Sequence, residues 1–278
     1  MLFVLPAAVY VAWFHLFPVL YGFYLSLTSY SPLDRGGPSF VGLQNYVSLF
    51  GSPQFRNSVL VTGQYVLEVL PFTIVLSLGL ALLANRSMIG ISIFRAMLYL
   101  PRVVSLTAVS LIWLWLYSRD GWFNEILDMF GAGPVDWLLN PDTAMHSVVL
   151  MRIWKSLGGN MVLLLAGLQT IPRELYEAAE SDGAGPWQRF RYVTLPGLRT
   201  ILMYVVTMDI VYLSQSFAEL YILTQGGPVG ATTTTNYLIY QQAFQYNQMG
   251  EASAMAFVLF ALIAGFSVLA IRSMGRRP

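Results

Sequence analysis

Polar and ionisable side chains interrupt the long apolar runs of this sequence at a few positions. Such residues are costly in lipid and by default mark a polar pathway or a binding site. The most regular set is Asp209, Tyr212 and Ser216, whose spacing of three and four residues predicts one shared helical face. A phenol ring beside hydroxyl and carboxylate groups suits a sugar, whose C–H face stacks while its hydroxyls form hydrogen bonds.

A second polar stretch, Ser156–Asn160, follows Lys155 in another apolar run and contains the adjacent glycines Gly158 and Gly159. The two glycines predict that a helix loosens here. Unwound backbone that lines a cavity exposes carbonyls and amides that bind polar solutes. We therefore expect the two polar stretches to face each other across a mid-membrane cavity, with Asn160 opposite Asp209.

Structural roles compete with this interpretation. Arg152 and Lys155 can instead extend to the outer membrane surface. Glu68 or Arg102 can be half of an interhelical ion pair, and Asp209 can neutralise a buried cation rather than contact a solute. His15 and His146 we interpret as ordinary packing or interfacial residues.

The sequence carries no motif for catalysis. A phosphate-binding loop of the form G-x-x-x-x-G-K-[ST] needs a glycine before its lysine, but the only lysine, Lys155, follows Trp154. The chain has no cysteine, which excludes disulfides and thiolate metal ligands, and its two histidines make a histidine-rich metal site unexpected. We expect no catalytic residue, metal or cofactor on this chain.

Composition predicts a protein built for lipid. Of the 278 residues, 56% are hydrophobic and 10% are charged, whereas soluble domains carry about 25% charged residues. The net charge of +1 gives no reason to expect nucleic acid as a partner. Six runs approach the roughly 20 apolar residues that a spanning helix needs. They are Leu2–Leu27, Val59–Leu83, Phe94–Tyr117, Ser147–Leu168, Thr200–Leu223 and Ala254–Ile271.

We expect one transmembrane domain over residues 1–278. The first run is too long for the apolar region of a cleavable signal peptide, so we expect it to be a retained span. The positive-inside rule orients the spans. Nine arginines share one side if both termini are cytoplasmic: Arg86, Arg95, Arg173, Arg189, Arg191, Arg199, Arg272, Arg276 and Arg277. The opposite loops hold three: Arg35, Arg56 and Arg119.

The long polar segment Glu174–Leu198 lies on this basic, cytoplasmic side. Pro172 fits the first position of a helix, and Leu175, Ala178 and Ala179 then share one face of that helix. Gly183 is a C-terminal stop signal, and a second short helix is expected before Leu195-Pro196. The segment therefore predicts two short helices joined by a glycine turn.

This segment resembles the EAA loop of the membrane subunits of bacterial ABC importers. The resemblance rests on the spacing of six residues: Glu177, Ala178, Ala179, Gly183, Leu195 and Pro196. It implies that residues 169–199 form a cytoplasmic coupling loop that docks into a cleft of the ATPase subunit. Two adjacent alanines suit this role because they give a flat face that another protein can approach closely. The alternative is a surface loop that only caps the helix bundle.

The outer loops are similar to those of the carbohydrate and glycerol-phosphate branch of these importers, in the first of its two permease types. The similar passages include Phe40–Tyr46, Pro134–Leu138 and the uncharged stretch from Leu223 to Gly250. The resemblance covers nearly the whole chain. It implies that solute contacts lie at two points, which correspond here to Lys155, Ser156, Gly159 and Asn160, and to Asp209, Tyr212, Leu213 and Ser216.

The resemblance implies an all-α integral membrane protein with six transmembrane helices and the type I ABC importer permease fold. It would be a non-catalytic subunit in a bacterial inner or plasma membrane, working with a second permease, two ATPase subunits that use ATP and Mg²⁺, and an extracytoplasmic solute-binding protein. Its solute would be a sugar or, alternatively, a glycerol-phosphate or glycerophosphodiester. Rival classes are an integral membrane enzyme and an ion-coupled secondary transporter.

Overall fold

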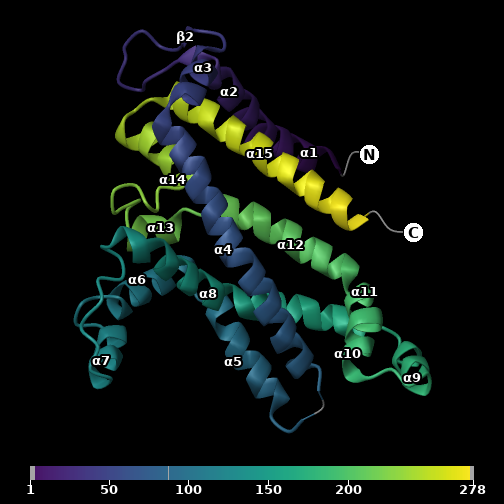
Figure 1. Ribbon diagram of the computed structural model, residues 1–278. Coiled ribbons are helices and arrows are strands. Elements are labelled where there is room, and N and C mark those ends of the chain that lie inside the picture. Colours follow the sequence, from purple (N-terminus) through teal and green to yellow (C-terminus); the bar gives the residue numbers. More distant parts are fainter. Residues whose placement is uncertain (1–3, 87, 276–278) are drawn as a thin grey trace. The chain divides into compact units, whose positions relative to one another are not determined.

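The computed structural model describes residues 4–86 and 88–275, almost all of them in helices or short connections (Figure 1). Contacts between Cα atoms divide the chain into two units. The first unit holds Met1–Thr62 and Thr233–Ala264, and the second holds Gly63–Thr232 and Gly265–Pro278. Two long helices, α4 and α15, begin in the first unit and end in the second.

The first unit contains both strands of a small β-hairpin and the first residues of the two long helices. Its elements are α1 (Leu5–Val11), the π-helical η2 (Ala12–Leu16), α2 (Phe17–Ser26), β1 (Thr28–Ser29), β2 (Ser39–Phe40), α3 (Gln44–Gly51), the start of α4 (Pro53–Ala84), α14 (Thr235–Tyr240), the π-helical η4 (Gln241–Gln245) and the start of α15 (Met249–Gly275).

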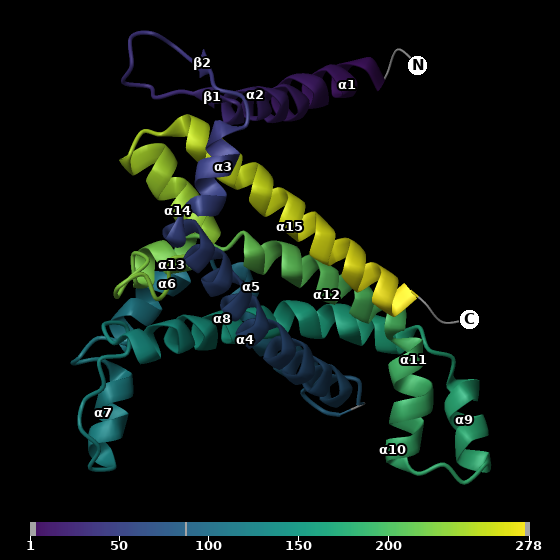
Figure 2. The same ribbon diagram turned by 45° about the horizontal axis from the view of Figure 1, so that its top comes forward.

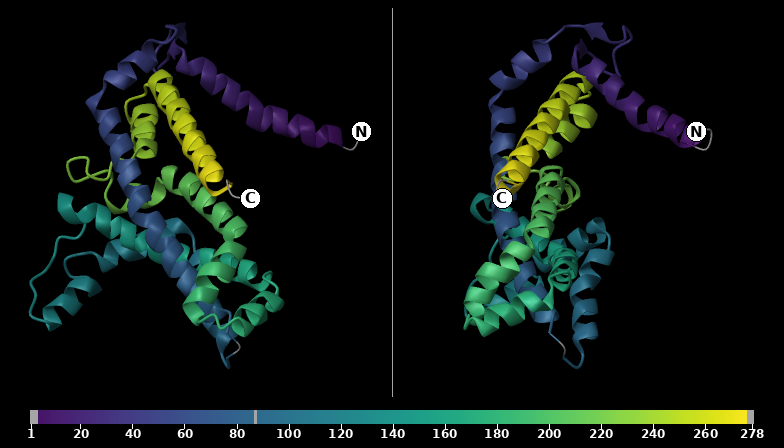
Figure 3. Two further views of the ribbon diagram at one scale, coloured as in Figure 1. Left: turned by 45° about the vertical axis from the view of Figure 1, so that its right-hand side comes forward. Right: turned by 90° about the vertical axis from the view of Figure 1, so that its right-hand side faces the viewer.

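Close backbone contacts order this unit. β1 pairs antiparallel with β2, with Thr28 opposite Phe40. Asn45 of α3 donates hydrogen bonds to the carbonyls of Ser26 and Thr28, which ties α3 to the end of α2. Helix α15 lies beside α14 (Figure 3), and Leu238 and Met255 pack in one apolar cluster between them. Helix α14 continues directly into η4 within the uncharged stretch that precedes α15.

The second unit contains the remaining helices. They are α5 (Ile91–Val103), α6 (Leu106–Leu116), α7 (Trp122–Met129), α8 (Pro141–Gln169), α9 (Arg173–Ser181), α10 (Pro186–Arg189), the π-helical η3 (Phe190–Thr194), α11 (Leu195–Gly197), α12 (Arg199–Ser214) and α13 (Ala218–Leu223).

Four single helices are long and apolar enough to cross a membrane: Leu5–Ser26, Pro53–Ala84, Pro141–Gln169 and Met249–Arg272. They confirm four of the predicted runs, although residues 2 and 3 of the first run lie outside the described residues, as do Arg276 and Arg277. Two further spans are pairs of helices with a sharp bend, so the described chain has up to six spans.

The third predicted span, Phe94–Tyr117, is wrong as a single helix, because α5 and α6 meet at 95°. Pro101 lies inside α5 and lacks a backbone N–H. Ser105 then caps a new helix, since its hydroxyl accepts from the Ala108 N–H at 3.2 Å. The break leaves carbonyls without helical partners, and the Lys155 ammonium donates to two of them, Pro101 at 2.7 Å and Val104 at 2.6 Å.

Two other local expectations are corrected. The fifth run was expected to continue to Leu223, but α12 ends at Ser214, and the separate α13 begins at Ala218. Helix α8 does not loosen at Ser156–Asn160 and continues unbroken to Gln169. The glycines serve packing instead. A Cβ atom on Gly158 would overlap the Leu98 carbonyl oxygen, so this glycine lets α5 and α8 approach closely.

The apolar core of the second unit surrounds the C-terminal half of α8. Its fully buried members include Ala81, Met161, Leu164 and Leu198, drawn from α4, α8 and the connection before α12. This core fixes the helices that carry the polar residues discussed next.

Candidate solute site and coupling loop

Asn160 and Asp209 meet as expected. The Asn160 amide donates to the Asp209 Oδ2 atom at 2.6 Å, which joins the middle of α8 to α12. Asn160 is buried and Asp209 is half-buried. A carboxylate at this depth must face water, solute or a polar partner. The pair therefore places one fixed carboxylate and one fixed amide between two spans.

The other residues predicted to line the solute site from α12 do not lie together. The Tyr212 side chain is exposed, whereas Leu213 is buried. Ser216 is also buried and lies beyond the end of α12, with its hydroxyl on the Tyr212 carbonyl at 3.4 Å. The expectation that Tyr212 and Ser216 share a helical face is wrong, because the helix stops at Ser214 before the next turn.

Lys155 lies at the centre of α8 and is buried. Its ammonium is bonded to the two carbonyls at the break between α5 and α6, so it does not extend to the membrane surface. Ser156 is half-buried one turn before Gly159. A Cβ atom on Gly159 would lie 3.3 Å from Arg102 Nε, so the Arg102 side chain lies across this glycine.

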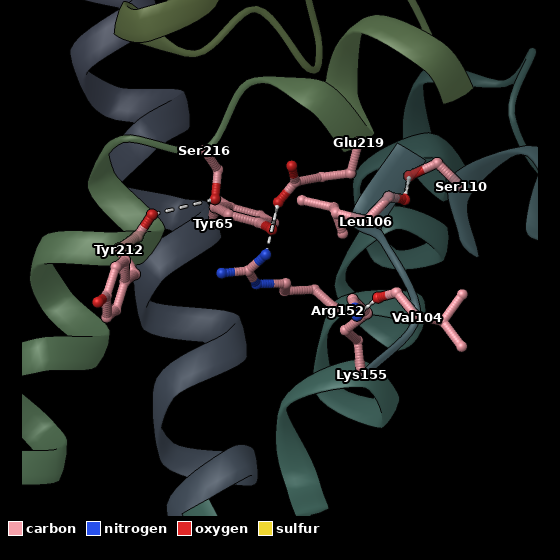
Figure 4. A network of polar contacts seen from close by, with 9 residues as sticks. All are labelled: Tyr65, Val104, Leu106, Ser110, Arg152, Lys155, Tyr212, Ser216 and Glu219. Atoms are coloured by element: carbon pink, nitrogen blue, oxygen red, sulfur yellow. Dashed lines mark hydrogen bonds and ion pairs between the residues drawn. The ribbon is translucent and has the colours of Figure 1, made fainter. Parts of the chain in front are cut away.

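A polar network that the sequence did not predict joins Tyr65, Arg152 and Glu219 (Figure 4). Glu219 of α13 is fully buried, and its Oε1 atom accepts from the Tyr65 hydroxyl at 2.9 Å. The same oxygen is 3.3 Å from Nη1 of Arg152 on α8. The network joins α4, α8 and α13, so Arg152 is paired and does not extend to the surface. Glu219 was visible in the sequence as a charge in an apolar run, but its partners were not.

Glu68 also has a partner on another helix. Its Oε2 atom is 2.8 Å from His146 Nδ1 at the start of α8, and its Oε1 accepts from Gln64 at 2.8 Å. Glu68 therefore has a partner on another helix, and the contact is an ion pair only when His146 is protonated. Nothing in the spacing of the sequence singles out His146 as this partner.

The polar loop forms two short helices, α9 and α10, which lie side by side (Figure 2). Gly183 ends α9 with a φ of 79°, a conformation that favours glycine. The Ala184 N–H bonds the Ala179 carbonyl at 2.9 Å, and the Gly183 N–H bonds the Glu180 carbonyl at 3.0 Å, which is the Schellman pattern. The expected glycine turn is confirmed, but Pro172 precedes the helix, which starts at Arg173.

The loop presents its motif to the surface. Glu177 and Ala178 are exposed, and Ala179 is half-buried. Glu177 also lines a cavity of about 590 Å³ together with Asn85, Gln169, Arg173 and Tyr176. Leu195 and Pro196 lie in the short helix α11, and the nearby Tyr176 hydroxyl is 3.0 Å from the Thr194 hydroxyl. The loop is thus internally braced and leaves an acidic face open.

Comparison with known protein families identifies the family of this chain. Residues 47–275 match the family described as binding-protein-dependent transport system inner membrane component. The chain belongs to this family. It is a permease subunit of an importer and not a membrane enzyme.

Relatives of this permease serve several transport systems. The trehalose/maltose transport system permease protein MalF of Thermococcus litoralis is 34% identical, with 98% of this chain and 92% of the relative covered. The arabinooligosaccharides transport system permease protein AraP of Bacillus subtilis is 34% identical, with 99% and 88% covered. The sulfoquinovosyl glycerol transport system permease protein SmoG of Agrobacterium fabrum is 36% identical, with 92% and 84% covered.

Solved structures share the permease fold. A bacterial ABC transporter involved in the import of the acidic polysaccharide alginate superposes with a TM-score of 0.86 at 22% identity, covering 99% of this chain and 94% of that chain. The same transporter in complex with an alginate pentasaccharide-bound periplasmic protein also gives 0.86. The fold is therefore the all-α type I importer permease fold. Within the described residues, no three His, Cys, Asp or Glu side chains gather as a metal site.

Proposed function

We propose that this permease translocates a sugar or a related polar solute across a bacterial inner membrane. It would pair with a second, similar permease, and two ATPase subunits would supply the energy from ATP and Mg²⁺. An extracytoplasmic binding protein would deliver the solute. The distribution of arginines supports cytoplasmic termini, and the relatives named for sugar transport support a sugar.

The Asn160–Asp209 hydrogen bond is the observation that carries the solute site. It brings together the two predicted stretches, and the exposed Tyr212 ring lies one helical turn beyond Asp209 on α12. The carboxylate and amide would bind solute hydroxyls, and the ring would stack on the apolar sugar face. Ser156 would extend the site along α8. Lys155, Leu213 and Ser216 would shape it from behind, because all three are buried.

The exposed face of α9 supports a docking role for the loop over residues 169–199. Glu177 would contact a basic residue of the ATPase, and Ala178 and Ala179 would allow close approach. Gly183 would hold the turn, and Leu195 and Pro196 would pass the motion to α12. Closure of the ATPase pair on ATP would then shift the spans between outward and inward access.

Uptake by the reconstituted complex tests this function. Proteoliposomes would contain this permease, its second permease and the ATPase subunits, with the binding protein outside and ATP inside. We expect uptake of labelled maltose, trehalose or an arabino-oligosaccharide that requires both ATP and the binding protein. Uptake that persists without the ATPase subunits would instead identify an ion-coupled transporter.

A further inference from the structure

The charges around the proposed solute site do not balance. Three cations, Arg102, Arg152 and Lys155, interact electrostatically with one another or with the nearby acids. Among the described residues, two acids interact with these cations, Asp209 and Glu219. Glu219 already pairs with Arg152 at 3.3 Å. Because unbalanced charge is expensive between spans, the surplus cation requires an explanation.

Arg102 is the cation of the three that no protein group among the described residues binds. Within residues 4–86 and 88–275 it forms no ion pair and donates no hydrogen bond, and its side chain is exposed. It lies in the last turn of α5, where a cation suits the negative end of the helix dipole. That role is already filled, since the Lys155 ammonium bonds the Pro101 and Val104 carbonyls at the break.

The position of Arg102 is near the solute site. Its side chain crosses Gly159, with a Cβ atom at residue 159 lying 3.3 Å from Arg102 Nε. The next residue, Asn160, holds Asp209, and the charge of Arg102 acts on that carboxylate. The lack of a side chain at Gly159 lets the Arg102 side chain lie against α8, next to the residue that precedes Asn160.

We infer that the transported solute carries an anionic group, such as a carboxylate or sulfonate, and that Arg102 binds it. A guanidinium presents paired N–H donors that match the two oxygens of such a group. Asp209 and Asn160 then bind the hydroxyls of the same solute. This inference rests on the proposed function and assigns its substrate class.

Charged thiol reagents measure the local charge at an introduced cysteine. This chain has no native cysteine that would react in its place. Ser156→Cys places a small, near-isosteric thiol one turn from Gly159 on α8. The assembled complex in membrane vesicles is treated with anionic sulfonatoethyl or cationic trimethylammonioethyl methanethiosulfonate. We expect the anionic reagent to react faster, and Arg102→Gln to lower the anionic-to-cationic rate ratio by about ten-fold or more. The matched control, Arg119→Gln in the outer loop, should leave the ratio unchanged.

The outcomes separate the two claims. An unchanged ratio in Arg102→Gln overturns the anionic solute and means that a carboxylate of another subunit or of lipid neutralises Arg102. A thiol at residue 156 that reacts with neither reagent overturns the solute site itself. As a second arm, galacturonate should slow labelling by N-ethylmaleimide in the Arg102 protein and not in Arg102→Gln. Equal protection by galactose, its neutral counterpart, would contradict the inference.

Discussion

At the scale of single residues, the partners of Asp209 bear on whether it binds solute or neutralises a buried cation. Asp209 bonds an amide at 2.6 Å and forms no ion pair within the described residues. Removing a hydrogen bond to a charged group costs about 1.5–3 kcal/mol. We therefore expect Asp209→Ala to reduce uptake by about ten-fold or more, with the yield of assembled complex unchanged.

Uptake and complex yield are measured together for this variant. Asp128→Ala, which removes an exposed carboxylate on α7, is the matched control and should leave uptake normal. Normal uptake in Asp209→Ala would remove Asp209 from the solute site. A loss of assembled complex would instead assign the residue a structural role.

The Glu219–Arg152 pair leads to the opposite prediction, because the Glu219 side chain is fully buried and that of Arg152 is only 13% exposed. Glu219→Gln leaves the Arg152 guanidinium without its counter-charge, and breaking a buried pair costs about 3–5 kcal/mol. We expect lower thermal stability of the purified permease complex. Replacing both partners, as Arg152→Met with Glu219→Leu, should restore most of the stability. If the double variant is no more stable than the single one, charge pairing is not what holds α13 on α8.

At the scale of elements, Gly158 sets the distance between α5 and α8. Gly158→Ala would force a methyl group onto the Leu98 carbonyl, and overpacking of this kind costs about 1–3 kcal/mol. Gly79→Ala in α4 is the matched control, since nothing lies within 4 Å of its added Cβ atom. Thermal unfolding of the purified complex should show a lower midpoint for Gly158→Ala and no loss for Gly79→Ala. Equal midpoints would contradict the close approach of these helices.

A charge reversal in the coupling loop should impair function without a folding defect. Glu177 is exposed and lines the cavity next to Arg173, so Glu177→Lys reverses the charge of the proposed docking face. We expect ATP hydrolysis by the complex to continue while uptake is lost. Glu174→Lys makes the same charge change outside the cavity and should retain uptake. Uptake and hydrolysis are assayed in the same vesicles, and normal uptake in Glu177→Lys would reject the docking role.

At the scale of the whole molecule, the sequence predicts what depends on local pattern. The apolar runs gave four single-helix spans, and the position of Gly183 gave the turn between α9 and α10. The features that the sequence did not predict depend on contacts between residues far apart in the chain. The break at Val104 is stabilised by Lys155 from a distant helix. Glu219 is held by Tyr65 and Arg152, which are far from it in sequence. A short polar sequence cannot reveal such partners, because nothing in its own spacing specifies them.

The orientation of the whole chain is tested by cysteine accessibility, again free of native thiols. Gly133→Cys in the loop before α8 has open space around its added Cβ atom, and Gly185→Cys in the coupling loop meets only the Gln188 side chain at 3.8 Å. Because the distribution of arginines predicts a cytoplasmic coupling loop, an impermeant maleimide should label residue 133 in intact cells. Residue 185 should be labelled only after the membrane is opened. The reverse pattern would invert the topology and, with it, separate the coupling loop from the compartment that holds ATP.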